Sequence, residues 1–194
     1  MKKISPTASA DAARAADLRR AFRERPLSTL LATGFGAGLA PIAPGTAGSG
    51  LALAAAWLFS RAISPFHMPS VVAAVGLLTS GLLVALAGVG ISGRVAHVLG
   101  RKDPGCIVLD EIAGQLLSCA VVPLFAYPSP RTAAAAWIAS FLAFRLFDVW
   151  KPGPIHGWQA LPGGWGIVVD DVAAGALAAG VTAGVAALLS ARPA

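Results

Sequence analysis

The longest uncharged stretch of the chain limits its fold more than any other sequence feature. Residues 62–93 contain no Asp, Glu, Lys or Arg, and residues 70–91 are apolar almost throughout. A helix that crosses the hydrocarbon core of a bilayer needs roughly 20 such residues. A soluble helical protein with a large core does not need an apolar run of this length, so the stretch predicts a membrane-spanning helix.

The composition also favours a membrane protein with a single folded domain. Of the 194 residues, 56% are hydrophobic and 12% are charged, whereas about 25% of the residues in an ordinary soluble domain are charged. The 15 Lys and Arg exceed the nine acids, but seven of these basic residues precede the first apolar stretch. Under the positive-inside rule this predicts a basic cytoplasmic tail, residues 1–26, and a membrane-embedded domain, residues 27–194. Nucleic acid is therefore not expected as a partner.

The remaining apolar runs divide this domain into helices. We expect about five spans, at residues 49–63, 70–91, 110–127, 131–147 and 170–190. Residues 27–40 are short for a span and contain three glycines, which favours a helix that lies in the interface or enters the membrane part-way. The predicted fold is an all-α polytopic bundle of about five spans plus this N-terminal interfacial or re-entrant helix.

Residues 41–50, PIAPGTAGSG, lie between that helix and the first span. Two prolines and three glycines exclude a helix interior and predict a loop. A glycine-rich turn before a helix N-terminus can bind an anion, although a tight connection between two helices would explain the residues equally well. The GxxxxGK[ST] pattern is absent, so a nucleotide-binding P-loop is not supported.

Charged residues at the ends of the apolar runs suggest where a site would lie. If the tail is cytoplasmic and each run crosses once, the glycine-rich loop and three charged helix ends fall on the cytoplasmic face. This layer holds Thr46, Asp110, Glu111, Arg145, Asp148, Lys151, Asp170 and Asp171.

Structural explanations exist for each member of this layer. Asp110 and Asp170 could be helix N-caps, with Glu111 and Asp171 in first turns where the helix dipole favours negative charge. Arg145 and Asp148 could form an i,i+3 ion pair, and Lys151 could extend to the membrane interface. The same pattern nevertheless occurs at three helix ends that the topology brings together, and ionisable groups at membrane depth usually mark function.

Electrostatics favours a metal ion in this layer. Five carboxylates with only two cations nearby would repel one another at low dielectric, and a divalent cation removes the repulsion. Every candidate ligand is an oxygen, with no cluster of His or Cys, which favours Mg²⁺, with Mn²⁺ as a substitute, over Zn²⁺. Mg²⁺ commonly partners a phosphate that Arg or Lys holds. The layer therefore predicts a phosphate-ester site.

Four segments, in this order, resemble the phosphatidylglycerophosphatase A family: GLAPIAPGTAGS (38–49), LDEIAGQ (109–115), FRLFDVWKPGPI (144–155) and GGWGIVVDDVAAG (163–175). The resemblance runs from about residue 30 to 180. It implies a Mg²⁺-dependent phosphatase of the bacterial inner membrane with its active site facing the cytoplasm. Its substrate would be the membrane phospholipid phosphatidylglycerophosphate, hydrolysed to phosphatidylglycerol and inorganic phosphate in phospholipid biosynthesis.

The resemblance also suggests roles for the charged layer. The acids would bind the metal or its water: Asp110, Glu111, Asp148 and Asp171, with Asp170 as a further ligand or a helix cap. Three of them, Glu111, Asp148 and Asp171, are the expected catalytic residues, and a metal-activated water would attack phosphorus in line. The phosphate would be bound by Arg145, Lys151, Thr46 and the backbone of Gly45 and Gly48.

Two hypotheses from other classes compete with the phosphatase. A small membrane cation carrier could use the same carboxylate cluster, but a transport pathway should place ionisable groups near the middle or on both sides of the membrane. A non-catalytic assembly subunit is the third hypothesis. The motifs of histidine-dependent and aspartyl-phosphate phosphatases are absent. The sequence assigns no role to Cys106 or His156, and no oligomeric state.

Overall fold

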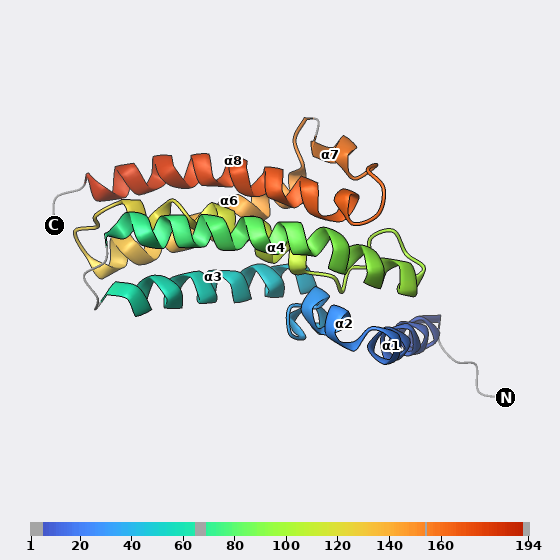
Figure 1. Ribbon diagram of the computed structural model, residues 1–194. Helices are drawn as coiled ribbons and strands as arrows, with labels where there is room; N and C mark the ends of the chain where they lie inside the picture. The colour runs from blue at the N-terminus through green and yellow to red at the C-terminus, as the bar shows by residue number, and fades with distance from the viewer. Residues whose placement is uncertain (1–5, 65–68, 154, 192–194) are drawn as a thin grey trace.

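The computed structural model describes residues 6–64, 69–153 and 155–191 (Figure 1). These residues form helices and no strands, so the predicted all-α class is confirmed. The elements are α1 (Pro6–Glu24), α2 (Pro26–Ala32), η1 (Ala37–Leu39), α3 (Pro44–Ile63), α4 (Ser70–Leu99), α5 (Leu109–Cys119), η3 (Val122–Leu124), α6 (Pro130–Trp150), α7 (Ile155–Trp158) and α8 (Trp165–Ser190).

Three helices of the described chain are long and apolar enough to cross a membrane: α4, α6 and α8. They contain 30, 21 and 26 residues. At ~1.5 Å per residue, each can cross a hydrocarbon core of about 30 Å. Helix α3 has 20 residues and lies alongside them, but it is not among these three. The expected count of about five spans is therefore not confirmed.

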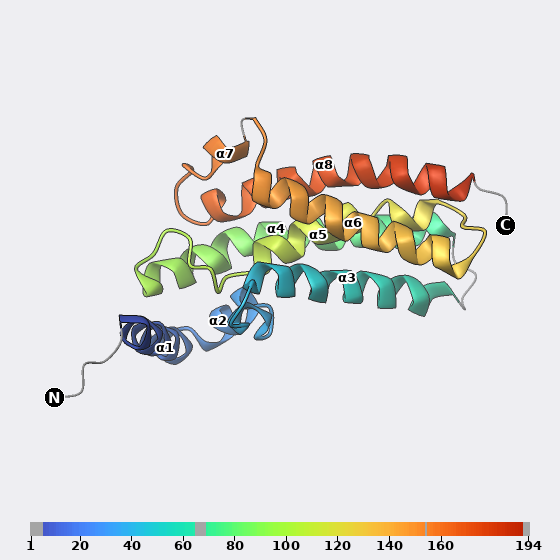
Figure 2. The same cartoon turned by 180° about the vertical axis from the view of Figure 1, so that it is seen from behind.

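The expected third span, residues 110–127, is instead a short helix at the centre of the bundle. Helix α5 has 11 residues, which makes it about 16 Å long and too short to cross a bilayer by itself. It packs against α3, α4, α6 and α8, and eight of its residues are buried. Figure 2 shows it between α4 and α6. Hydropathy alone led to the prediction of a span here, because a helix buried in protein is as apolar as one that faces lipid.

The long helices bury small residues and expose large ones. Ala52, Ala74, Ala136 and Ala178 are typical of the buried side chains, whereas Leu residues dominate the outward faces, with Leu86 68% exposed. Membrane helices pack in this way because lipid tails are as apolar as Leu, so close contact between backbones drives their association. The distribution agrees with a membrane protein.

Residues 27–40, expected to form an interfacial or re-entrant helix, begin as α2 and then turn back. Positive φ angles at Gly34, Phe35 and Gly36 follow the helix. The segment packs on the loop that leads into α5, where the Val108 N–H donates to a carbonyl of α2 over 2.8 Å. A Cβ atom at Gly38 would collide with the carbonyl oxygen of Cys106. The segment therefore supports the start of α5.

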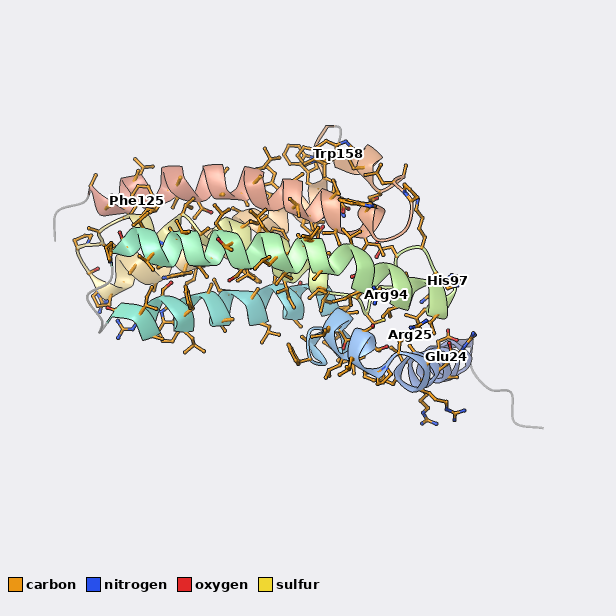
Figure 3. All side chains as sticks on the ribbon, in the orientation of Figure 1. Glu24, Arg25, Arg94, His97, Phe125 and Trp158 are labelled. Carbon is orange, nitrogen blue, oxygen red and sulfur yellow. The ribbon has the colours of Figure 1, made fainter. Side chains whose placement is uncertain are left out.

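Helix α1 lies within the expected basic tail. It packs against α2 and α4, and the Thr29 hydroxyl of α2 donates to the Ala21 carbonyl over 3.0 Å. Figure 3 shows Arg25 beside α1 and Arg94 on α4 at the same end of the molecule, with Phe125 at the opposite end. Basic side chains from distant segments thus gather at one end of the bundle.

Candidate metal and phosphate site

Helix ends that are far apart in sequence meet at one end of the bundle. Helices α3, α5 and α8 begin there and α6 ends there (Figure 1). Carboxylate oxygens of Asp110, Glu111 and Asp171 lie within 4.8 Å of one another. The structure thus joins acids from two helices in one cluster, which we call the carboxylate triad.

Helix capping does not explain these acids. Val108 occupies the N-cap position of α5, and no side chain caps that helix. Asp110 and Glu111 stand in its first turn, where the helix dipole favours negative charge. Helix α8 begins at Trp165 and has no acid in its first turn. The alternative that Asp110 and Asp170 are N-caps is therefore wrong.

The triad contains buried oxygen atoms without hydrogen-bond partners. Asp110 Oδ1 and Glu111 Oε2 are both buried, and neither accepts a hydrogen bond from any described part of the chain. Asp110 and Asp171 are buried as whole side chains. Burying unpaired carboxylates is unfavourable, and three at this spacing repel one another. A divalent cation would neutralise them and use the unpaired oxygens, so the triad could hold a metal ion.

Arg145 lies beside the triad and is held from two sides. Its Nη1 is 2.6 Å from Asp148 Oδ2, which is the expected i,i+3 ion pair. The same nitrogen donates to Ser49 Oγ over 3.3 Å. Glu111 also interacts electrostatically with both Asp148 and Arg145. The guanidinium is therefore oriented at the edge of the acidic cluster, with 20% of its side chain exposed.

Lys151 neutralises the other side of the acidic layer. It ends α6 in the left-handed conformation, with φ 46°. Its Nζ contacts Asp170 Oδ2 and lies 3.6 Å from Asp171 Oδ1 and 3.8 Å from Asp148 Oδ1. Burial alone would lower the pKa of Lys151, but these three carboxylates raise it above its ordinary value. Lys151 thus stays charged and does not extend to the interface.

Residues 44–50 were expected to form a loop, but they form the first turns of α3. Of the three residues expected to bind phosphate there, Gly45 lies closest to the charged groups. A Cβ atom at Gly45 would collide with Glu111 Oε1 and lie 3.4 Å from Arg145 Nη1. Gly48 packs elsewhere, since its Cβ would lie 2.7 Å from Val108 Cβ, and Thr46 is exposed. The backbone at Gly45 therefore lies between Glu111 of the triad and Arg145.

Helices α5 and α8 cross at Gly114 and Gly175, and this crossing sets the distance between the acids that the two helices carry. A Cβ atom at Gly175 of α8 would collide with the carbonyl oxygen of Gly114 in α5. Gly114 is four residues after Asp110, and Gly175 is four residues after Asp171, so each glycine lies one turn below an acid on the same helix face. This close approach of α5 and α8 brings the two acidic turns together.

Three polar residues that sequence reasoning left out also border the site. Ser49 is buried, accepts from Arg145 and donates to the Gly45 carbonyl over 2.9 Å. Gln159 Nε2 donates to Asp170 Oδ2 over 3.0 Å, and Asp103 interacts electrostatically with Lys151. Ser49 belongs to the glycine-rich motif and could have been found there. Gln159 and Asp103 stand in loops without any local signal.

Comparison with known proteins shows that the chain is similar in sequence to lipid phosphatases. The model of the family described as Phosphatidylglycerophosphatase A matches residues 30–186. The Escherichia coli K12 protein named Phosphatidylglycerophosphatase A is 36% identical over 154 residues, which cover 78% of this chain and 79% of that protein. The protein of the same name from Haemophilus influenzae is 34% identical, over 75% of this chain and 80% of its own length.

A third relative carries a different name. A Bacteroides thetaiotaomicron protein, provisionally named as a phosphatidylinositol-3-phosphatase, is 36% identical over 152 residues, covering 77% of this chain and 87% of its own. No solved structure matches the chain significantly. All three relatives are named for the removal of phosphate from a phospholipid.

Proposed function

Because the chain belongs to the phosphatidylglycerophosphatase A family of lipid phosphatases, we propose that it hydrolyses phosphatidylglycerophosphate to phosphatidylglycerol and inorganic phosphate with the help of Mg²⁺. One observation carries this proposal. Glu111 of the carboxylate triad lies against the same glycine, Gly45, as the guanidinium of Arg145. A phosphate monoester bound there would meet a metal-binding group on one side and an arginine on the other.

The triad of Asp110, Glu111 and Asp171 is our assignment for the metal site. Its oxygen ligands and its unpaired buried atoms suit a hard divalent cation such as Mg²⁺, or Mn²⁺ in its place. When bound, such a cation neutralises charge on a phosphate ester and lowers the pKa of water. Asp148 and Asp170 are both paired with cations, which makes them supporting residues in this proposal.

We assign the phosphate to Arg145. Its ion pair with Asp148 and its bond to Ser49 hold the guanidinium in one orientation, as bidentate recognition of a phosphate requires. The first turn of α3 adds backbone N–H groups that have no partner within the helix. Lys151 is held by three carboxylates, so it contributes to phosphate binding only if it leaves one of them.

Glu111 is our choice as the proton acceptor for the attacking water. Within the triad it lies beside Gly45 and interacts with Arg145. It therefore stands between the proposed metal and the proposed phosphate. A carboxylate in this position can accept the proton that water loses as it attacks phosphorus.

We also propose that the site faces the cytoplasm of a bacterial inner membrane. Helix α1 and the last turns of α4 lie at the site's end of the bundle (Figure 1). They carry Arg19, Arg23, Arg94 and His97. An excess of Lys and Arg marks the cytoplasmic side of membrane proteins, where it also favours contact with anionic lipids.

Removal of divalent cations tests the metal assignment. Purified protein in detergent is expected to release phosphate from phosphatidylglycerophosphate, to lose this activity in excess EDTA and to regain it with Mg²⁺, because the triad alone has no positive charge to offer the phosphate. Phosphatidylinositol 3-phosphate serves as the competing substrate. Full activity in EDTA would contradict the metal site. Cation uptake by proteoliposomes, with no phosphate released under any divalent ion, would support the carrier instead.

The substitution Gly45→Ala tests the contact between the first turn of α3 and the triad. The new Cβ would displace the carboxylate of Glu111, a flexible side chain, so activity should fall about tenfold to a hundredfold while the melting temperature changes little. The matched control is Gly184→Ala on α8, where a Cβ meets no atom within 4 Å. Equal activity of the two variants would show that the position of Glu111 does not matter for the reaction.

A further inference from the structure

An apolar groove runs along the outside of the bundle between α3 and α6. Leu53 and Trp57 of α3 and Trp137 and Ile138 of α6 line it, together with Gly50, and it encloses about 270 Å³. Figure 2 shows these two helices side by side. A larger cavity of about 700 Å³ continues the groove away from the site and shares Trp57 and Trp137 with it.

No close contact within the chain explains why residue 50 is a glycine. A Cβ atom at Gly50 would meet no atom within 4 Å, whereas one at Gly45 or Gly48 would collide with a neighbour. A glycine inside a helix destabilises it relative to alanine, and here no backbone approach explains the glycine. The absence of a side chain at Gly50 keeps the Gly50 end of the groove open.

One end of the groove lies close to the proposed phosphate site. Gly50 directly follows Ser49, which accepts a hydrogen bond from Arg145. On α6, Ile138 stands seven residues before Arg145, which is about 10 Å along the helix axis. From Gly50 the groove follows α3 to Trp57, again about 10 Å. Its two walls therefore belong to the helices that carry the phosphate-binding residues.

We propose that this groove binds one acyl chain of the phospholipid substrate while the phosphate of the same molecule lies at Arg145. The proposal rests on the proposed function and extends it from the headgroup to the lipid tail. The apolar walls suit methylene groups, which would gain van der Waals contacts with the groove. Because the groove ends one residue from Ser49, which Arg145 contacts, a lipid whose phosphate lies at Arg145 fits the groove better than a second copy of this protein does.

Filling the groove tests the proposal. In Gly50→Leu, kcat/KM for dioleoyl phosphatidylglycerophosphate in mixed micelles is expected to fall about tenfold, because the new side chain removes on the order of ten carbon–carbon contacts between the acyl chain and the groove. Activity on the deacylated, water-soluble headgroup phosphate should stay unchanged. The matched control is Gly180→Leu on α8, at another glycine whose Cβ would meet no atom within 4 Å, and it should change neither activity.

Two outcomes of this experiment would contradict the proposal that the groove binds an acyl chain of the substrate. An equal loss on both substrates would mean that the Gly50→Leu substitution disturbs the phosphate site, and no loss on either would mean that the substrate does not use the groove. If wild-type protein releases phosphate from neither substrate, the proposed function itself fails, which is a distinct result.

Photo-crosslinking tests directly which molecule occupies the groove. Phosphatidylglycerophosphate with a diazirine on one acyl chain is expected to label residues 50–57 and 134–138 in wild-type protein and to label them less in Gly50→Leu. Unlabelled phosphatidylglycerophosphate should compete, and phosphatidylcholine should not. Equal competition by both lipids would show only bulk lipid in the groove, and crosslinks between two protein chains would show a second copy there. Either result overturns the proposal.

Discussion

The substitutions Glu111→Gln and Asp171→Asn are each expected to lower kcat/KM for phosphatidylglycerophosphate by more than about a hundredfold. Loss of residues that only support a metal's ligands typically costs 10–100-fold, so loss of a ligand should exceed that range. Both changes preserve shape and remove charge from a triad whose oxygens lie within 4.8 Å of one another. Phosphate release at saturating Mg²⁺ measures the effect.

Binding of Mn²⁺, followed by electron paramagnetic resonance, separates a lost metal from a lost base. We expect Asp171→Asn to weaken Mn²⁺ binding, and Glu111→Gln to impair both binding and the reaction. Asp17→Asn, on an exposed position of α1, is the control and should behave as wild type. Full metal-dependent activity in both triad variants would exclude the proposed site.

The substitution Gly175→Ala is expected to lower the free energy of unfolding by about 1–3 kcal/mol, which is typical of overpacking. The added methyl group would collide with the backbone of Gly114, and a backbone cannot rotate away as a side chain can. At roughly 2–4 °C per kcal/mol, the melting temperature in detergent should fall clearly. Activity should fall as well, because separation of α5 and α8 also separates Asp110 from Asp171.

Gly180→Ala is the matched control for this experiment. It lies on the same helix, and its Cβ would meet no atom within 4 Å. Alanine favours a helix over glycine by about 1 kcal/mol, so this variant should be as stable as wild type or slightly more so. A Gly175→Ala variant with the stability of Gly180→Ala would show that the glycine crossing is not tightly packed.

Local sequence predicted those features of the site that depend on local chemistry. Asp110, Glu111 and Arg145 stood out because a charge is rare in an apolar run. The i,i+3 pair of Arg145 and Asp148 follows from helix geometry alone, and the structure contains it. The loop predicted over residues 41–50 was wrong beyond residue 43, because α3 begins at Pro44 and continues through all three glycines; a proline is tolerated in the first turn of a helix, and glycine weakens a helix without ending it.

Features that depend on partners distant in sequence could not be predicted. Helix α5 was taken for a span because its apolar residues contact protein on every side, and hydropathy does not distinguish protein from lipid. Lys151 was expected to bind phosphate, whereas its nearest partners in the structure are carboxylates from α6 and α8. Gln159 contacts Asp170 from a loop, and no pattern in that loop predicts the contact.

The sequence by itself determined that the chain is a helical membrane protein and that its acids stand near helix ends, because runs of apolar residues and breaks in them are local properties. Only the tertiary structure decided which acids share one site. That choice depends on how closely two helices approach, and the backbone contact between Gly114 and Gly175 sets the approach. It brings Asp171 to Asp110 and Glu111 and leaves Asp170 with Lys151.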